Sequence, residues 1–594
     1  MERIRDAYCS NPTLLELGGL GVPFTAQKLR HPKLVWINHR WLLQNRIKVD
    51  DQQAVDSAVR WIEEHLGFAV PQSHDQPAEY IEAFKTFKAD RYGGSGIGPH
   101  GGSGRCGTWD GFQVKGIGVT PLVGSGLGYE HSHGAVTLEE AIREATYSEL
   151  LCQEAPFGAV PVIAIIATGT RMHWGEPRAL LIRPPFMRAS HLERAPFFRP
   201  VSARLNAERD YSNDVARVIR TVQMVSSKDR QEDLLVRVKD LHEFIDRSTR
   251  QLAFSHVHRL YFGACSTSNL TINGEILDFG SARALVNWSS VECMHGAPRF
   301  GRDDLELLLS GCREIEFYIK KYAPNSAFLD KRADLELHLR ESYEAHLLRS
   351  FHEVSGGECT ADRDNGSHLA GIIASYFNRQ QDGLKLSFLT GHSPNEQRSL
   401  YEEICERQEL VGDGVQKECF KHASRRSSCA LPGHHEFSDV RLHHMRRMLM
   451  PRNELFREVL QQKIYKEIID ALAPSDPNFR HRTSEFIRNS VSRARRIFRW
   501  FSAEWIIMGS ASNSYSTVLV AQHRSSGKSL ALLHGHVLEG RLYFHGQALA
   551  LERDRPDGTL WFSVILPDSY SGAAIELPVF GQACVIPAAD VFYG

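Results

Sequence analysis

The segment with the clearest chemical pattern covers residues 268–280 and reads Ser-Asn-Leu-Thr-Ile-Asn-Gly-Glu-Ile-Leu-Asp-Phe-Gly. Its central pair, Asn273-Gly274, strongly favours a two-residue turn between antiparallel strands. Such a hairpin would bring Asn269 and Asp278 to its two open ends. An amide oxygen and a carboxylate placed there can hold Mg²⁺ against a triphosphate. The alternative is an ordinary surface hairpin with an aspartate in a tight turn.

Two residues upstream could complete a nucleotide site. Lys115 follows a strand-like run, and a lysine on a strand beneath a glycine-rich loop can reach nucleotide phosphates. Glu144 lies on a predicted helix over 137–154, whose start is marked by a capping box from Thr137 to Glu140. A carboxylate there could pair with Lys115 and orient it. The alternatives are a surface lysine on an edge strand and a solvated helix glutamate.

A glycine-rich segment at 93–104 precedes Lys115 and ends in Gly102-Ser103-Gly104-Arg105. Glycines let backbone N–H groups approach a phosphate closely, and Arg105 could add positive charge. Gly102, Gly104 and Arg105 are therefore candidate nucleotide-binding residues. The alternative is a flexible connector.

The order of these motifs resembles that of the protein kinases, in which Asp278-Phe279-Gly280 would be the metal-binding triplet. More specifically, the chain resembles the selenoprotein O (SelO) family of protein-kinase-like adenylyltransferases over roughly residues 88–325. Besides the spacing of Asn269 and Asp278, the resemblance rests on four short segments. They are Gly102-Ser103-Gly104-Arg105, Lys115-Gly116-Ile117-Gly118-Val119-Thr120-Pro121, Ile142-Arg143-Glu144 and Ser148-Glu149.

The resemblance implies a set of phosphate-binding arginines and a reaction. In the family, two arginines flank a stretch containing Ser-His. Arg188 and Arg194 stand in this relation to Ser190-His191, and Arg183 competes with Arg188 for the first place. The family binds ATP inverted relative to kinases, so that AMP is transferred instead of phosphate. The implied cofactors are ATP, held by Lys115 and the arginines, and Mg²⁺, held by the two ends of the hairpin.

One departure from the family leaves the acceptor open. The family usually has an aspartate directly before the metal-binding asparagine, and this chain has Ser268. A hydroxyl acceptor benefits from a general base, whereas a carboxylate acceptor is already deprotonated at pH 7. We therefore expect an ATP-dependent adenylyltransferase acting on a protein or peptide. The alternatives are a carboxylate-activating enzyme of microcin-type peptide maturation and a non-catalytic nucleotide-binding pseudokinase.

The composition favours a globular intracellular protein. The 594 residues include 70 Lys and Arg against 71 Asp and Glu, so the net charge of -1 makes nucleic acid an improbable partner. The eleven cysteines contain no C-x-x-C pair and are typical of reduced thiols in a cytoplasmic protein. The longest apolar run, 160–167, is far shorter than the ~20 residues of a membrane-spanning helix.

The pattern of apolar residues predicts an α+β protein with a protein-kinase-like two-lobe fold and additions after it. We expect helix over 51–88, strands at 160–168 and 178–183, and helices over 203–225, 231–254, 302–322, 331–350, 364–381, 438–473 and 478–502. The expected parts are an N-terminal extension (1–87), a β-rich N-lobe (88–200), a helical C-lobe (201–385), a helical extension (386–504) and a small β-rich domain (505–594).

A second candidate surface is an arginine-rich predicted helix over 480–499, where Phe486, Ile487 and Phe498 lie among seven arginines. Such a helix could bind an acidic peptide, RNA or a partner subunit. The simpler interpretation is a solvated face that is packed through its apolar residues.

Overall fold

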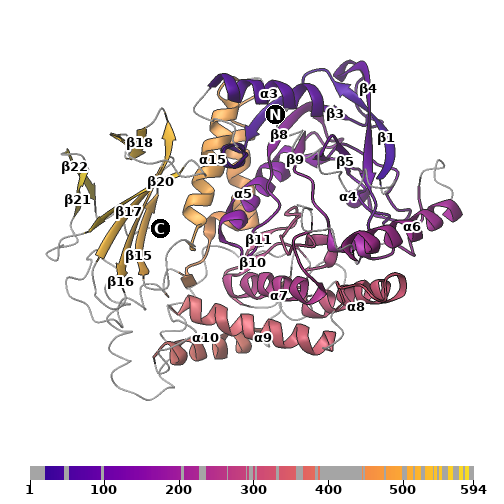
Figure 1. Cartoon of the computed structure of the whole chain (residues 1–594). Coiled ribbons are helices and arrows are strands. Elements are labelled where there is room, and N and C mark those ends of the chain that lie inside the picture. The colour runs from indigo at the N-terminus through magenta and orange to yellow at the C-terminus, as the bar shows by residue number, and fades with distance from the viewer. Residues whose placement is uncertain are drawn as a thin grey trace.

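The computed structural model describes most of the chain between residues 21 and 587. The described parts are 21–45, 52–94, 100–201, 207–226, 236–263, 265–288, 291–292, 299–300, 304–329, 334–355, 365–381, 386–387, 445, 448–473, 476–497 and the strands between 505 and 587. The chain is of the mixed α+β class, as expected, with a large antiparallel sheet and about ten helices (Figure 1).

Nine strands form the large antiparallel sheet, in the order β2-β8-β9-β6-β5-β4-β1-β3, with β7 paired to β9. They are β1 (Gly21–Leu29), β2 (Lys33–Ile37), β3 (Phe68–Ala69), β4 (Tyr80–Asp90), β5 (Cys106–Trp109), β6 (Phe112–Lys115), β7 (Val136–Thr137), β8 (Ala164–Arg171) and β9 (Pro177–Arg183). The predicted strands at 160–168 and 178–183 correspond to β8 and β9. The continuous apolar run of β8 is buried on both faces of the sheet.

The expected helix over 51–88 is wrong in its second half. Helix α3 (Gln52–Leu66) ends before Gly67, where a Cβ would stand 2.5 Å from the carbonyl oxygen of Glu63. The chain then forms β3, a single 3-10 turn and the long strand β4. The expected boundary at residue 88 falls inside β4, so residues before it contribute strands to the same sheet.

Helix α5 (Leu138–Glu154) packs against the large sheet and confirms the helix predicted over 137–154. The Thr137 side chain caps its start by accepting from the Glu140 N–H at 3.1 Å. Apolar residues of α5 share one core with residues of β7, β8 and β9. Helix α5 is therefore held against β8 and β9, next to β6, the strand that carries Lys115.

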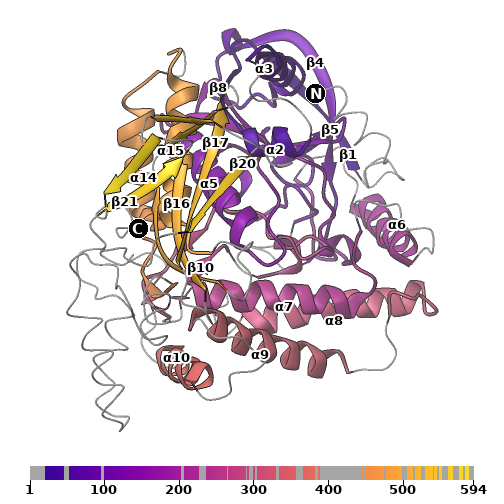
Figure 2. The same cartoon turned by 60° about the vertical axis from the view of Figure 1, so that its left-hand side comes forward.

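A layer of helices lies below the sheet in both views (Figures 1 and 2). Its members are α6 (Ala207–Ser226), α7 (Leu241–His258), α8 (Asp304–Tyr322), α9 (Leu335–Val354) and α10 (Asn365–Gln381). Helices α6, α8, α9 and α10 correspond to the helices predicted over 203–225, 302–322, 331–350 and 364–381. The helix predicted over 231–254 begins only at Leu241, because Asp240 caps it there and residues 236–240 are not helical. Two one-turn 3-10 helices, η2 (Ala189–Leu192) and η4 (Thr267–Asn269), contact each other and pack against α8 of this layer.

Two later helices, α14 (Arg457–Ile464) and α15 (Phe479–Ala494), pack against α5. The arginine-rich helix therefore ends at Ala494, five residues before its predicted end. Phe486 and Ile487 are buried in the main core, and Arg496 is only 4% exposed, with its backbone N–H bound to Glu154. These contacts favour a helix that is packed through its apolar residues over a helix with a free basic face. Phe498 and Arg499 lie outside the described residues.

The C-terminal strands form a six-stranded sheet with β20 paired to β17, and a separate hairpin of β21 and β22. They are β15 (Trp505–Ser512), β16 (Ser516–His523), β17 (Ser529–Leu538), β18 (Arg541–Phe544), β19 (Gln547–Ala550), β20 (Thr559–Ile565), β21 (Ala574–Val579) and β22 (Gln582–Pro587). The β-rich character expected after residue 504 is confirmed. The polar stretch at 390–435 lies outside the described residues.

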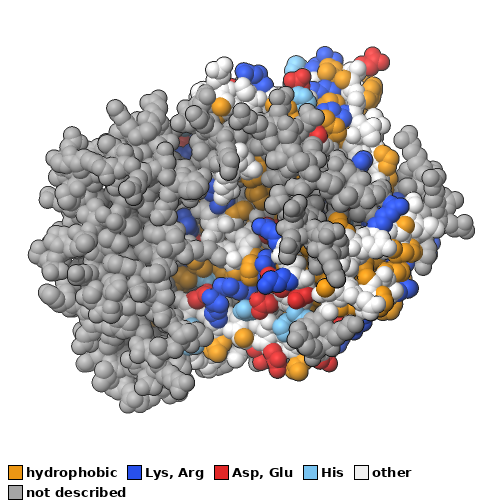
Figure 3. Space-filling view, in the orientation of Figure 1, with side chains coloured by type: hydrophobic (Ala, Val, Ile, Leu, Met, Phe, Trp, Pro, Cys, Tyr) orange, Lys and Arg blue, Asp and Glu red, His pale blue; other side chains and the backbone are white. Residues whose placement is uncertain are grey.

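Short elements connect these layers. They are α2 (His39–Gln44), α4 (Tyr129–Ser132), β10 (Leu260–Tyr261), β11 (Arg283–Ala284), β12 (Val291–Glu292), β13 (Arg299–Phe300), β14 (Leu386–Ser387), η1 (Pro77–Glu79), η7 (Asn453–Leu455) and the π-helical turn η8 (Tyr465–Ile469). Within the described residues, no helix combines the length and the apolar character needed to cross a membrane. Figure 3 shows basic and acidic side chains mixed over the middle of one face.

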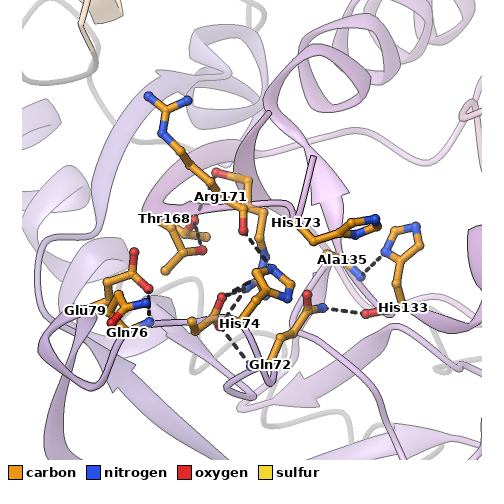
Figure 4. A network of polar contacts seen from close by, with 12 residues as sticks. Gln72, His74, Gln76, Glu79, His133, Ala135, Thr168, Arg171 and His173 are labelled. Carbon is orange, nitrogen blue, oxygen red and sulfur yellow. Dashed lines mark hydrogen bonds and ion pairs between the residues drawn. The ribbon is translucent and has the colours of Figure 1, made fainter. Parts of the chain in front are cut away.

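A buried polar network joins the loop at 72–75 to β9. The Asp75 carboxylate accepts from the Arg178 guanidinium at 2.9 and 3.0 Å, from the Tyr80 hydroxyl at 2.6 Å and from the Gln72 N–H at 2.9 Å. The Gln72 side chain in turn donates to the carbonyl of His133 at 2.6 Å (Figure 4). The network fixes this loop to the sheet.

Candidate functional site

The lysine and glutamate selected from the sequence form a buried ion pair. Lys115 is the last residue of β6, where backbone pairing with Cys106 and Leu181 places it between two strands. Glu144 lies on the buried face of α5. Lys115 Nζ donates to Glu144 Oε1, and both side chains are only 1% exposed. At this depth an unpaired charge is costly, so each side chain stabilises the other.

Asp278 meets the same lysine from a different part of the chain. Lys115 Nζ lies 2.7 Å from Asp278 Oδ1, although the two residues are 163 positions apart in sequence. The Asp278 side chain is 35% exposed, in contrast to its buried partner. Its backbone has φ of 66°, in the left-handed region that few residues other than glycine adopt. Asp110 and Arg259 also have positive φ, so this conformation is consistent with a functional position but does not define one.

The charges around these carboxyls set their pKa values in opposite directions. Burial alone would raise the pKa of Asp278, but the Lys115, Arg105 and Arg183 cations outweigh it and hold that pKa well below its usual range. Burial raises the pKa of Glu144, and the neighbouring Asp278 carboxylate adds to this against the opposing effect of Lys115. Asp278 is therefore the carboxylate that stays ionised at any ordinary pH.

Arg105 links the end of the glycine-rich segment to both acidic elements. Its guanidinium lies 3.0 Å from Glu140 Oε1 and 3.8 Å from Asp278 Oδ1. Burial would raise the pKa of Glu140, but Arg105 and Lys115 hold it below its ordinary value. Two cations therefore face Asp278, and Arg105, with 30% of its side chain exposed, is the more accessible of them.

The glycine-rich segment is a fixed structure from residue 100 onward, not a flexible connector. The N–H of Gly101 donates to the Leu122 carbonyl at 3.3 Å, and the N–H of Ser103 donates to the Asp90 carbonyl at 2.8 Å. A Cβ on Gly102 would stand 2.1 Å from that same Asp90 carbonyl, so only glycine fits there. These two amides are used within the chain, and residues 95–99 lie outside the described residues.

The predicted hairpin is present, but its turn is longer than expected. Asn269 and Leu277 are joined by a backbone hydrogen bond of 3.1 Å, and Leu270 pairs with Ile276. The N–H of Thr271 bonds to the carbonyl of Glu275, which leaves a three-residue loop, 272–274, in place of the two-residue turn. The loop is held from outside because the Arg237 N–H donates to the Asn273 side chain at 2.7 Å.

Both candidate metal ligands border Gly263. A Cβ on Gly263 would stand 3.6 Å from the side-chain nitrogen of Asn269 and 4.0 Å from the backbone carbonyl oxygen of Asp278. Mg²⁺ commonly uses one or two protein oxygens together with phosphates and water, and the ionised, partly exposed Asp278 carboxylate can supply one of them. No group of three or more His, Cys, Asp or Glu suited to a metal occurs in the described parts.

The three candidate arginines occupy different environments. Arg188 donates to the carbonyl of Ser268 and stacks on the Tyr92 ring at 4.6 Å, which places it directly at the hairpin. Arg183 is buried, donates to the Gln113 side chain at 2.6 Å and lowers the pKa of Asp278.

Arg194 points to another part of the molecule. Its guanidinium is bound to Asp214 of α6 at 2.6 Å. The structure therefore brings Arg183 to the Lys115–Asp278 cluster, places Arg188 at Ser268 beside Asn269, and ties Arg194 to the helical layer.

Several residues around the site were not selected from the sequence. His191, quoted only as part of the Ser-His stretch, lies 2.8 Å from Asp90 and accepts from the backbone N–H of Arg188 at 2.9 Å. Arg143, quoted only within Ile-Arg-Glu, donates to the carbonyl of Gly280 at 2.5 Å. Asp90 carries no motif of its own, and the segment before it was predicted as helix, so no local signal marked it.

Compared with known proteins, the chain matches no family model and no curated protein sequence. The site is therefore interpreted from its own geometry.

Proposed function

We propose that this chain is a protein-kinase-like enzyme that binds Mg²⁺ and ATP and transfers AMP to a protein or peptide acceptor. The observation that carries the proposal is the position of Lys115. It contacts Glu144 from α5 and Asp278 from the hairpin at once, and these three residues lie in distant parts of the sequence. A lysine held by a helix glutamate beside a metal-binding aspartate is the arrangement that kinases use for nucleotide phosphates.

Each residue has a defined part in this proposal. Lys115, Arg183 and Arg188 would bind the phosphates, and Arg105 would face them from the end of the glycine-rich segment. Asn269 and Asp278 would hold Mg²⁺, which neutralises phosphate charge when it is bound. The contribution of the protein is then mainly positioning and electrostatic stabilisation.

The resemblance to the SelO family supports AMP transfer over phosphate transfer. Arg188, which belongs to the Ser-His stretch that carries part of this resemblance, lies against the hairpin. A cytoplasmic setting is supported by the described cysteines Cys106, Cys152, Cys265 and Cys312, all of which are free thiols.

A second candidate is activation of a carboxylate acceptor, because Ser268 stands where the family has an aspartate. Its hydroxyl lies 2.7 Å from that of Ser266. A serine hydroxyl is a poor proton acceptor at neutral pH, and a carboxylate acceptor has no proton to lose.

Two labelled forms of ATP test the proposal. With Mg²⁺ and a mixture of protein and peptide acceptors, we expect label to be transferred from α-labelled ATP and not from γ-labelled ATP. Transfer from γ-labelled ATP alone would make the chain a kinase. Binding of ATP without transfer of either label would make it a pseudokinase.

A further inference from the structure

Helix α5 presents two carboxylates to the candidate site, and only Glu144 was selected from the sequence. Glu140 and Glu144 lie four residues apart, so they occupy neighbouring turns on one face of the helix. Glu144 binds Lys115, and Glu140 accepts a hydrogen bond from Arg105 Nη1 at 3.0 Å. Each of these two carboxylates therefore holds one of the two cations that face Asp278.

Both carboxylates also border the end of the hairpin that carries Asp278. A Cβ on Gly280 would stand 2.9 Å from Glu140 Oε1 and 3.2 Å from Glu144 Oε1, so a side chain there would crowd both acidic groups. The same point lies 3.5 Å from Nη2 of Arg105. Glu140 therefore belongs to the same cluster as the residues that would hold the metal and the phosphates.

The two terminal nitrogens of the Arg105 guanidinium face different carboxylates. Nη1 donates to Glu140, whereas Nη2 lies 3.8 Å from Asp278 Oδ1, an ion-pair distance that is too long for a hydrogen bond. The donors of a guanidinium form a rigid planar fork, so a partner at one nitrogen restrains the direction of the other. The hydrogen bond to Glu140 therefore directs Nη2 toward Asp278.

We propose that Glu140 is a positioning residue for the nucleotide phosphates, which it serves by holding Arg105 with one nitrogen directed at the Asp278 side of the site. The inference rests on the proposed binding of ATP at this site. Glu140 acts through Arg105 and contacts neither ATP nor the metal itself. Its role parallels that of Glu144, which restrains Lys115 one helical turn further along α5.

The direction of the effect on ATP binding separates positioning from simple charge. Burial would raise the pKa of Glu140, but the Arg105 and Lys115 cations hold the pKa below its ordinary value, so the carboxylate is ionised at neutral pH. An anion near the phosphates repels them, so removal of the Glu140 charge alone should strengthen ATP binding. Loss of the restraint on Arg105 should instead weaken ATP binding.

A double-mutant cycle of Glu140→Ala and Arg105→Gln tests the inference, with the dissociation constant of Mg²⁺-ATP measured by calorimetry. We expect Glu140→Ala to raise this constant about tenfold in the wild-type background and to have no further effect in the Arg105→Gln background. Glu140→Gln keeps an oxygen for the Nη1 hydrogen bond and should lie between wild type and Glu140→Ala. An unchanged or lower constant in Glu140→Ala, or an equal increase in both backgrounds, would overturn the inference.

Glu149→Ala is the matched control on the same helix. Glu149 pairs with Arg40 at 3.2 Å, and these side chains are 13% and 21% exposed, close to the 18% and 30% of Glu140 and Arg105. Both variants lose one partly exposed ion pair, so both should lose a similar small amount of stability in thermal unfolding. Only Glu140→Ala should weaken ATP binding, and an equal loss of affinity in both variants would count against a positioning role.

Lys115→Met keeps this inference separate from the proposed function. If the wild-type chain binds Mg²⁺-ATP and Lys115→Met weakens that binding, an unchanged affinity in Glu140→Ala refutes the role of Glu140 alone. If the wild-type chain binds no ATP, the proposed function and this inference both fail. Should Glu140→Ala not fold, Glu140→Gln takes its place in the cycle, with a smaller increase expected and the same refuting outcomes.

Discussion

Two buried cations on neighbouring strands of one sheet illustrate different uses of the same chemistry. Arg178 on β9 pairs with Asp75, and their side chains are 0% and 2% exposed. Lys115 on β6 pairs with Glu144 at a similar depth, but it also contacts Asp278, which is 35% exposed. Both cations bind carboxylates, so burial and charge do not distinguish them.

The difference lies in what satisfies each carboxylate. Asp75 accepts from a guanidinium, a hydroxyl and a backbone N–H of its own chain, and these hydrogen bonds fix it in place. Asp278 faces two cations, Lys115 and Arg105, and keeps one-third of its side chain accessible. A closed pair such as Arg178–Asp75 stabilises the fold. An open carboxylate such as Asp278, which is surrounded by cations, can bind a metal and phosphates.

The largest effect should come from the open carboxylate. Asp278→Ala should lower Mg²⁺-dependent AMP transfer by about 10³-fold or more, because the metal loses its charged ligand. Circular dichroism and thermal unfolding should show that the fold is retained. Near-normal turnover would mean that Asp278 is an ordinary turn residue.

The closed pair should show the opposite behaviour. Asp75→Asn leaves the Arg178 charge buried without a carboxylate, and it should lower the free energy of unfolding by about 3–5 kcal/mol. Denaturant unfolding measures this loss, and the ATP affinity of the folded fraction should stay as in wild type. A specific loss of ATP binding with unchanged stability would reverse the assignment of the two regions.

Lys115→Met should weaken productive ATP binding, with kcat/KM lower by about 10²-fold. The variant also leaves Glu144 buried without its cation, so stability should fall as well. Adding Glu144→Leu should restore stability but not turnover, because an apolar pair can replace a buried ion pair. Unaltered ATP affinity in Lys115→Met would make Lys115 a purely structural residue.

The arginines allow a finer comparison. Arg183→Gln should raise KM for ATP by about tenfold, since Arg183 acts on Asp278, whereas Arg194→Gln should leave KM unchanged and lower stability through Asp214. Steady-state kinetics with both variants shows which of the two arginines contributes to ATP binding. Equal effects on KM would place Arg194 at the phosphates as well.

The last expected effect is a pH dependence of stability that arises at Glu193. Burial raises its pKa from 4.5 to about 8, so between these values the folded chain binds one proton more than the unfolded chain. The free energy of unfolding should therefore fall by about 1.4 kcal/mol per pH unit as the pH rises through this window. Glu193→Gln should remove that slope, and an identical slope in both proteins would exclude the shift.

The sequence predicted the helices, strands and turns of the site better than the tertiary contacts that these elements make. Local signals identified α5 with its Thr137 cap, the strands β8 and β9, and the hairpin ends at Asn269 and Asp278. The predicted length of the turn at Asn273-Gly274 was wrong. The loop there is held by Arg237, which lies far from it in sequence. Local turn preferences cannot include such tertiary contacts.

The errors at charged residues have the same origin. Arg194 resembles a phosphate-binding residue by its spacing, yet Asp214 on α6 binds it. The N–H groups of Gly101 and Ser103 are bound to carbonyls of neighbouring segments, and this also depends on folding. Glu193 was not selected from the sequence, since nothing local indicates that it is buried beside Thr267.

Mass spectrometry of acceptors incubated with ATP and Mg²⁺ tests the central claim most directly. The account predicts a mass gain equal to AMP on the acceptor with the wild-type protein, and no gain when Mg²⁺ is removed or Asp278 is replaced by Ala. A gain equal to phosphate, or an AMP gain that persists undiminished in Asp278→Ala, would contradict it.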